Sequence, residues 1–543
     1  MKTVKMRAVC EGMLEKMEKN GKLLKTAPAV QKCLIRVMLL LCTTALTICC
    51  ILVVLYRSCI NANTLSETEG LTYAHNGLPQ VIMFAVLFVL SAVFFHFCAG
   101  LSKRGAAAAI AAAAVLAAVL AMIWNCMNPY PAFADQRRIM DAVAQYGQGL
   151  YSDINKEYFD QYHNQMGFVV LISFLYRCLR TDAYAIVGVC NCLSVGGIVV
   201  GMALISLELF HDRSVMVLTA WLTAVFLPLL IYSHFCYGTL MSLCCIIHGF
   251  VWSAKYLQTH ELWRAVVSTV LFSLAYLLYS GSLIGILAAA VVLFADLMPN
   301  SEDGLRRCMV RIIAFLMVLL IPILTENLTE RDFCRKTGIS VEEGIPATAF
   351  IAMGITSNDE VCPGAYDGTN IALYEQGGRN SDFANQKACE MIREALREFK
   401  EGRRGMTFFL RKLRYEWTDP WYSSLVMTTY KWSDTEISSP LFGWLVSEQV
   451  VTDAGEILSG YHLFIFLYAF IANIGICKKL WNEPESCNKG LLLIPVYFLG
   501  GFLFYLMWEA KPRYLLPYFV CFIPFGVYGS HRCYMRIRKK LMH

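Results

Sequence analysis

The sequence predicts an all-α polytopic membrane protein of about 12 to 13 transmembrane helices, with a small α or mixed α/β subdomain in an extracytoplasmic loop. Two observations support this fold class. Of the 543 residues, 57% are hydrophobic and only 16% are charged, and the mean hydropathy is +0.50. Apolar stretches long enough to cross about 30 Å of hydrocarbon also recur along most of the chain. These properties exclude a soluble globular enzyme.

Thirteen apolar segments are candidate spans, and their order sets the domain organisation. They lie at 34–56, 78–100, 105–124, 166–179, 184–209, 215–231, 238–254, 264–279, 282–297, 308–325, 459–477, 490–508 and 514–530. The first span is too long for a cleavable signal, so we expect a retained anchor. The predicted domains are a basic tail at 1–33, an N-terminal transmembrane bundle at 34–325 with an external loop at 125–165, an extracytoplasmic loop subdomain at 326–456, C-terminal transmembrane helices at 457–530 and a basic tail at 531–543.

The charge distribution predicts the topology. Both tails are rich in lysine and arginine, so the positive-inside rule places both in the cytoplasm of a multi-pass cell-membrane protein. An odd number of spans cannot leave both tails on one side. Either one segment is re-entrant or incomplete, or one tail is assigned to the wrong side. The segment 166–179 is the best candidate for an incomplete span because it is short and ends in Arg177 and Arg180. Basic tails beside membrane spans need no nucleic-acid partner to explain them.

The predicted loop subdomain is too long to be a simple connector, so we expect it to fold. Residues 384–401 place apolar side chains on one helical face. Residues 406–417 mix aromatic side chains with Arg411, Lys412 and Arg414, a pattern that favours a helix lying in the headgroup layer.

Cysteine and carboxylate spacing supports no cofactor or metal site. The 22 cysteines are mostly scattered through the spans, where thiols behave as small hydrophobic groups, and no CxxC pair occurs. No clear pair of carboxylates supports a divalent cation either. A divalent metal therefore stays open but unsupported.

Asp135 lies just beyond the span 105–124, at the start of an amphipathic stretch. A carboxylate there can take a proton from a hydroxyl at the membrane surface. Asp160, His163 and Gln165 follow before the next apolar segment and are candidates to face the same cavity. On spacing alone, a functional cluster and a hydrated loop are equally compatible with these residues.

A second candidate group lies between the last two spans. Glu509, Lys511 and Arg513 occur together where the chain turns outside the membrane, and a guanidinium at that depth can hold a phosphate through two parallel hydrogen bonds. An interfacial anchor of arginine and tyrosine explains the same residues equally well.

These motifs together resemble the glycosyltransferase C-fold superfamily, which includes protein O-mannosyltransferases, the aminoarabinose transferase of lipid A and a Gram-positive membrane branch. The resemblance covers most of the chain from about residue 100, through short motifs whose order matches. They are Ala134-Asp135-Gln136, Tyr162–Gly167, Phe235–Gly238, Arg513-Tyr514 with Pro517-Tyr518, and Ala349–Gly354 followed by Gly364–Tyr366.

The resemblance implies a glycosyltransferase that moves a sugar from a polyprenyl-phosphate donor to an extracytoplasmic acceptor, which is a cell-wall polymer, a glycolipid or a protein. By that resemblance Asp135 is the general base, Arg513 binds the donor phosphate and Lys511 assists. The remaining cavity or acceptor residues are Asp160, His163, Gln165, Tyr237 and Glu509.

The chain departs from the family pattern at two places. Thr239 stands where relatives often have an acid, and Tyr279 stands where they often have a lysine, so a second acidic site or an extra phosphate contact is in doubt.

Two other classes remain as alternatives. A lipid or glycan transporter usually places ionisable residues in mid-membrane, where this chain has few. A polysaccharide polymerase or ligase would rely on arginines of the long loop, such as Arg379 or Arg411.

Overall fold

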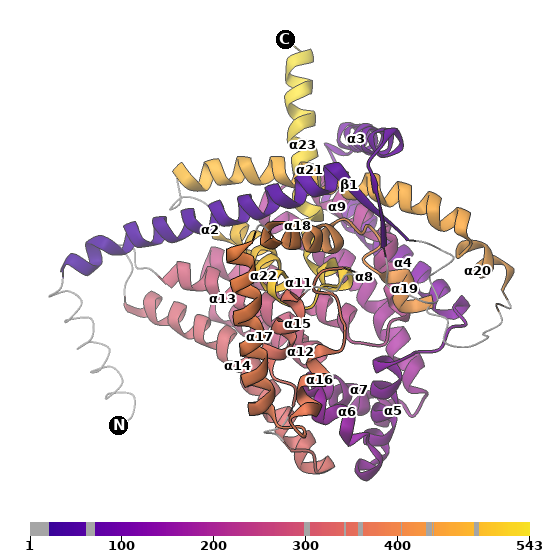
Figure 1. Cartoon of the computed structure of the whole chain (residues 1–543). Helices are drawn as coiled ribbons and strands as arrows, with labels where there is room; N and C mark the ends of the chain where they lie inside the picture. Colours follow the sequence, from indigo (N-terminus) through magenta and orange to yellow (C-terminus); the bar gives the residue numbers. More distant parts are fainter. Residues whose placement is uncertain are drawn as a thin grey trace.

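The computed structural model describes residues 21–60, 71–297, 305–340, 344–356, 362–402, 404–429, 437, 439–482 and 488–542. Figure 1 shows that these residues form an almost entirely helical molecule. Within them, nine helices are long and apolar enough to cross a membrane, or ten when one bent pair is counted as a span. The predicted all-α polytopic class is therefore confirmed.

The helices that pass this test follow one another along the whole chain. They are α2 (Gly21–Leu55), α3 (Leu78–Cys98), α4 (Lys103–Met127), α8 (Ala183–Phe210), α11 (Thr239–Thr259), α13 (Leu283–Leu297) together with the 3-10 turn before it, α14 (Leu305–Thr337), α21 (Glu448–Asn482) and α22 (Leu493–Met507) together with the 3-10 turn before it. The bent pair is α9 (Arg213–Ala224) with α10 (Leu227–Ile231), at an angle of 55°. Pro228 lies in the first turn of α10, where its missing N–H costs no helical hydrogen bond.

Fewer helices pass than the twelve or thirteen expected, because three predicted spans are helical but short or polar. Helix α7 (Met166–Leu179) has 14 residues and α12 (Leu262–Leu278) has 17. Helix α23 (Leu516–Leu541) is long, but its last turns carry arginines and lysines.

Helix α7 does not cross the bundle. Its start lies at the turn 235–238, because a Cβ on Gly238 would meet the Phe168 ring at 2.8 Å. Its end leads into α8 (Ala183–Phe210), whose Asn191 donates to the Phe235 carbonyl of that turn at 3.0 Å. Both ends of α7 therefore lie toward one end of the bundle. We call this the cavity end.

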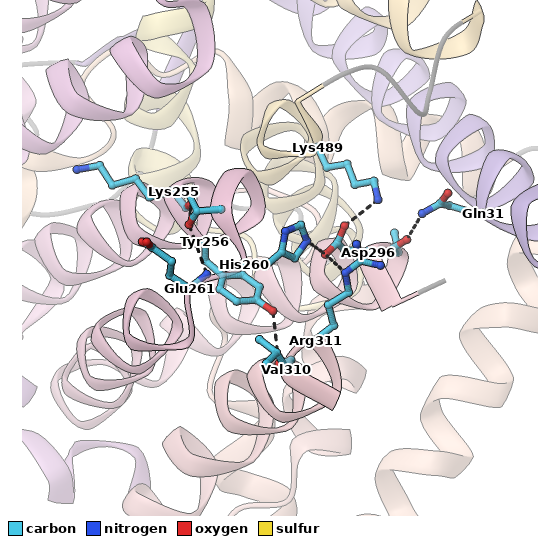
Figure 2. A network of polar contacts seen from close by, with 11 residues as sticks. Gln31, Lys255, Tyr256, His260, Glu261, Asp296, Val310, Arg311 and Lys489 are labelled. Carbon is cyan, nitrogen blue, oxygen red and sulfur yellow. Dashed lines mark hydrogen bonds and ion pairs between the residues drawn. The ribbon is translucent and has the colours of Figure 1, made fainter. Parts of the chain in front are cut away.

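At the opposite end of the bundle, a buried carboxylate ties four elements together, as Figure 2 shows. Asp296, near the end of α13, accepts from Lys489 Nζ at 2.7 Å and lies 2.9 Å from His260 Nε2. Arg311 Nε of α14 lies 3.4 Å from the same carboxylate. Gln31 of α2 donates to the neighbouring Ala295 carbonyl at 2.6 Å. We call Asp296, His260, Arg311 and Lys489 the Asp296 cluster.

A two-stranded hairpin that the sequence did not predict lies at the cavity end. Strand β1 (Tyr56–Ile60) pairs antiparallel with β2 (Leu71–His75), with Tyr56 opposite His75. The hairpin packs on the loop helix α18 (Arg404–Trp417), whose Arg414 guanidinium lies 4.0 Å from the centre of the Tyr73 ring.

In its described residues the segment between α14 and α21 consists of helices joined by turns, and it contains no strand. It contains α15 (Ala347–Ile355), α16 (Thr369–Gln376), α17 (Ser381–Glu401), α18, α19 (Ser424–Thr429) and α20 (Pro440–Leu445). Helices α14 and α21 themselves continue through residues 326 and 456, where the predicted subdomain began and ended. The helix predicted at 406–417 is present, but Lys412 and Glu416 are buried within the protein.

Candidate functional site

A cavity of about 980 Å³ opens at the cavity end of the bundle. Its walls come from the start of α5 (Asp135–Gln148), the turn 235–238, the loop segment around α15 and α16, and the turn between α22 and α23. Six of the eight predicted site residues line it: Asp135, His163, Tyr237, Glu509, Lys511 and Arg513. The structure therefore brings together residues that are almost 380 positions apart in the sequence.

Asp135 is the first residue of α5, and the residue before it has an unusual backbone. Ala134 has a φ of 46°, a left-handed value that is rare for alanine and turns the chain sharply into the helix. The side chain of Gln136 fixes this turn, because it accepts from Cys236 N at 2.9 Å and donates to the Met427 carbonyl at 3.3 Å. Asp135 itself is half-buried, and its carboxylate makes no hydrogen bond or ion pair with another described residue.

The turn after α22, residues 509–513, carries the positive side of the cavity, and we call it the positive turn. Lys511 Nζ lies 3.0 Å from Glu509 Oε1, and Tyr514 donates to Glu509 Oε2 at 3.1 Å. Arg513 Nη2 in turn donates to the Tyr514 hydroxyl at 3.2 Å. One carboxylate thus faces two cations, so the turn keeps an excess positive charge. An anion in the cavity would meet that charge in a half-buried setting, where screening by salt is weak.

Tyr237 lines the cavity beside Arg513. The Arg513 guanidinium lies 5.9 Å from the centre of the Tyr237 ring. Burial raises the pKa of the Tyr237 hydroxyl well above its usual value, the Asp135 carboxylate raises it further, and Arg513 opposes that rise. Asp135 and Arg513 therefore both lie close enough to influence this one hydroxyl, and all three residues line the same cavity.

The loop segment holds the positive turn from behind. Lys412 of α18 donates to the carbonyls of Gly354 and Trp508, and Ala510 N donates to the Gly364 carbonyl at 2.8 Å. A Cβ on Gly354 would lie 2.4 Å from the Trp508 backbone, so only glycine permits this approach. The positions of Lys511 and Arg513 therefore depend on the loop segment as well as on the two helices that flank them.

Asp160 and Gln165, the other two predicted site residues, lie outside the cavity lining. Asp160 accepts a hydrogen bond from the Tyr374 hydroxyl at 3.2 Å and so anchors α16. Gln165 is fully buried at the start of α7, and neither atom of its amide has a hydrogen-bond partner in the part of the chain that the structure describes. His163 does line the cavity, with its Nδ1 held 2.8 Å from Glu330 Oε1.

The two departures from the family pattern fall at different places. Tyr279 lines the cavity, so a phenol occupies the wall where a lysine was expected. Thr239 begins α11 and lines a small adjoining void instead. Among the described residues no group of three or more His, Cys, Asp or Glu side chains is placed to hold a metal ion.

Among the lining residues that were given no role from sequence are Tyr162, Tyr366 and Asn370. Tyr162 and Tyr366 occur inside motifs that the resemblance uses, so their place in the order of motifs could have suggested the cavity. Nothing in the pattern around Asn370 distinguishes it from other polar residues of the loop segment.

These features define a polytopic helical membrane protein with a cavity of mixed charge at one end. Residues 27–534 match a family described as conserved hypothetical integral membrane protein, and the chain belongs to that family. The comparison with curated proteins found no match.

Among solved structures, the chain is similar to the archaeal oligosaccharyltransferase AglB from Archaeoglobus fulgidus, in complex with an inhibitory peptide and a dolichol-phosphate. The TM-score is 0.37 and the sequence identity is 13%. The alignment covers 77% of this chain and 49% of that chain, so this chain spans about half of its length.

Proposed function

We propose that the protein is an integral-membrane glycosyltransferase. It moves a sugar from a polyprenyl-phosphate donor to the hydroxyl of an extracytoplasmic acceptor, such as a cell-wall polymer, a glycolipid or a protein. The observation that supports this most strongly is the shared cavity, which has the unpaired Asp135 carboxylate on one wall and Lys511 and Arg513 on another. A general base and a phosphate-binding cation must both reach one substrate, and this arrangement allows it.

In the proposed reaction, the acceptor oxygen attacks the anomeric carbon of the donor sugar. Asp135 accepts the proton of the acceptor hydroxyl, and the bond between the anomeric carbon and the phosphate oxygen breaks. The electron pair of that bond remains on the leaving phosphate, beside Arg513 and Lys511. Preorganised cations of this kind stabilise negative charge as it develops in the transition state.

The apolar wall of the cavity supports a lipid-linked donor. Leu283 and Ile284 begin α13, Phe504 lies near the end of α22, and all three line the cavity at the ends of spanning helices. The Phe504 side chain is 39% exposed. A lipid tail in the bilayer would therefore lie beside this wall while its phosphate reached the positive turn.

Transfer of radiolabelled sugar in proteoliposomes tests the proposal. We expect Asp135→Asn to lower transfer by about 10²–10⁴-fold and Arg513→Gln to weaken donor binding, with folding intact in both. Arg379→Ala is the matched control among loop arginines, because Arg379 pairs with Glu157 on the surface and does not line the cavity. Loss of transfer in Arg379→Ala with normal transfer in Asp135→Asn would instead support a polymerase or ligase.

A further inference from the structure

The loop segment contributes a buried amide to the cavity wall. Asn370, in the first turn of α16, is fully buried and lines the cavity. Neither Nδ2 nor Oδ1 of its amide makes a close hydrogen bond among the described residues, although the Tyr162 hydroxyl lies near enough for the amide to act on its pKa. Leaving buried polar groups unpaired costs about 1–3 kcal/mol, so such a group calls for an explanation, such as a ligand or an ordered water.

Helix α16 is held firmly, so this amide is positioned rather than loose. Tyr374, on the same buried face as Asn370, donates to Asp160 and accepts from Gly344 N at 3.0 Å. At the start of the helix, Thr369 N donates to Asp367 Oδ1 at 2.9 Å. Anchors before and after Asn370 thus fix its place in the wall.

Two tyrosines connect this amide to the charged part of the cavity. Burial raises the pKa of Tyr162, the nearby Tyr366 and Asp135 raise it further, and the Asn370 amide opposes that rise. The Tyr162 hydroxyl therefore lies near both Asn370 and the Asp135 carboxylate. Lys511 Nζ lies 5.1 Å from the centre of the Tyr366 ring. The wall thus runs from Asn370 through the two tyrosines to the positive turn.

This wall has the chemistry that recognises a sugar. An amide offers donors and an acceptor side by side, which suits adjacent hydroxyl groups, and a phenol can both donate and accept. Flat aromatic rings add apolar contact area for the C–H face of a pyranose. Asn370, Tyr162 and Tyr366 carry no formal charge, whereas the cations that would take a phosphate lie at the far end of the wall.

We propose that Asn370, Tyr162 and Tyr366 form a saccharide subsite that holds the donor sugar between the positive turn and Asp135. This inference rests on the proposed function, and it names the part of the cavity that reads the sugar. Because the subsite and the phosphate site use different residues, their contributions to binding are separable.

Equilibrium binding in nanodiscs tests the subsite with two kinds of probe. One is polyprenyl phosphate, and the other is polyprenyl phosphate carrying glucose, mannose or N-acetylglucosamine. We expect wild-type protein to bind at least one sugar-bearing lipid about tenfold more tightly than polyprenyl phosphate. Asn370→Leu removes that preference and leaves the affinity for polyprenyl phosphate within about twofold.

A thermal unfolding scan separates a ligand-binding amide from a structural one. Asn370→Leu replaces a buried amide that makes no close hydrogen bond by an apolar group of similar size, so we expect an unchanged or higher Tm. The matched control is Asn385→Ala, since Asn385 is exposed on α17 of the same segment and pairs with Thr348. We expect this control to keep the sugar preference.

The outcomes distinguish failure of the subsite from failure of the proposed function. If the wild-type protein binds all the lipids equally, or if Asn370→Leu lowers the Tm and leaves the sugar preference unchanged, the subsite is refuted and Asn370 serves only packing or an ordered water. If the wild-type protein binds neither kind of lipid, the proposed function itself is refuted.

Discussion

Two aspartates at opposite ends of the bundle show how differently this protein uses a carboxylate. Asp296 is buried and surrounded by His260, Arg311 and Lys489, which come from three other elements. Asp135 is half-buried at the rim of a cavity and has no ion-pair partner in the described chain. A carboxylate whose charge is satisfied internally stabilises the fold. One that is left unsatisfied beside a cavity is available to a substrate.

The largest expected effect is on catalysis at the cavity end. Asp135→Asn keeps the shape of the side chain but removes the base, and general base catalysis contributes about 10²–10⁴-fold. We expect turnover in proteoliposomes to fall by that factor, with an unchanged Tm. Asp141→Asn is the control, because Asp141 is exposed on the same helix and does not line the cavity. Normal turnover by Asp135→Asn would remove Asp135 from the mechanism.

At the opposite end, the corresponding change should affect stability and leave transfer intact. Asp296→Asn leaves three basic side chains without their shared acid, and losing one partner of a buried ion pair costs about 3–5 kcal/mol. We expect a clearly lower Tm in detergent. Turnover per folded molecule should stay near wild type. A normally folded but inactive Asp296→Asn protein would contradict the division of roles between the two aspartates.

The phosphate side of the cavity gives the next prediction. Hydrogen bonds to a charged group contribute about 1.5–3 kcal/mol, so we expect Arg513→Gln to weaken polyprenyl-phosphate binding by about 10- to 100-fold. Arg513→Lys keeps the charge but loses the planar guanidinium, so its loss of affinity for polyprenyl phosphate should be smaller. Titration of the lipid into nanodiscs measures both. Equal affinities for all three proteins would place the phosphate elsewhere.

Behind the positive turn, Glu416 should make stability depend on pH. Burial raises its pKa from 4.5 to about 8, and Lys412 opposes that rise. Between pH 4.5 and about pH 8, the folded protein holds a proton on Glu416 that the unfolded chain releases. The free energy of unfolding therefore falls as the pH rises through this range.

Glu416→Gln removes the titrating group, so the Tm of the variant should exceed that of wild type by a margin that grows from pH 5 to pH 8. Thermal unfolding at a series of pH values measures this margin. A constant difference at every pH would show that Glu416 keeps its charge in the folded protein.

The smallest effect is expected at the surface of the loop segment. Arg379 pairs with Glu157, but their side chains are 43% and 63% exposed. Pairs of this kind contribute about 0.2–1 kcal/mol. Arg379→Ala should therefore leave transfer unchanged and the Tm nearly so, as a transfer assay and a thermal scan would show. Loss of transfer would move the site away from the cavity.

Hydropathy was enough to predict the helical class. Nine or ten helices of the described chain pass as candidate spans, fewer than the twelve or thirteen expected, because apolar runs such as Leu262–Leu278 form shorter helices whose length composition alone does not fix. The β1–β2 hairpin was missed because Tyr56 pairs with His75, which lies well beyond it in the sequence. Short two-stranded pairings depend on their surroundings more than on local sequence.

The cavity itself was only partly predictable. Motif order pointed to Asp135 and Arg513 because those residue types carry recognisable chemistry. The positions of Lys412, Asn370 and Asp296 were not predictable, because each owes its environment to segments far away in the sequence. Lys412 illustrates this best. The sequence around it is typical of a helix at the membrane surface, whereas in the structure its amine donates to the buried carbonyls of Gly354 and Trp508.

A structure of the protein in a nanodisc with polyprenyl phosphate bound tests the central claim most directly. We predict that the phosphate lies against Arg513 and Lys511, that the lipid tail leaves past Phe504 into the bilayer, and that the Asp135 carboxylate faces the open space beside the phosphate. A phosphate bound outside this cavity, or at the end of the bundle that holds the Asp296 cluster, would contradict the account.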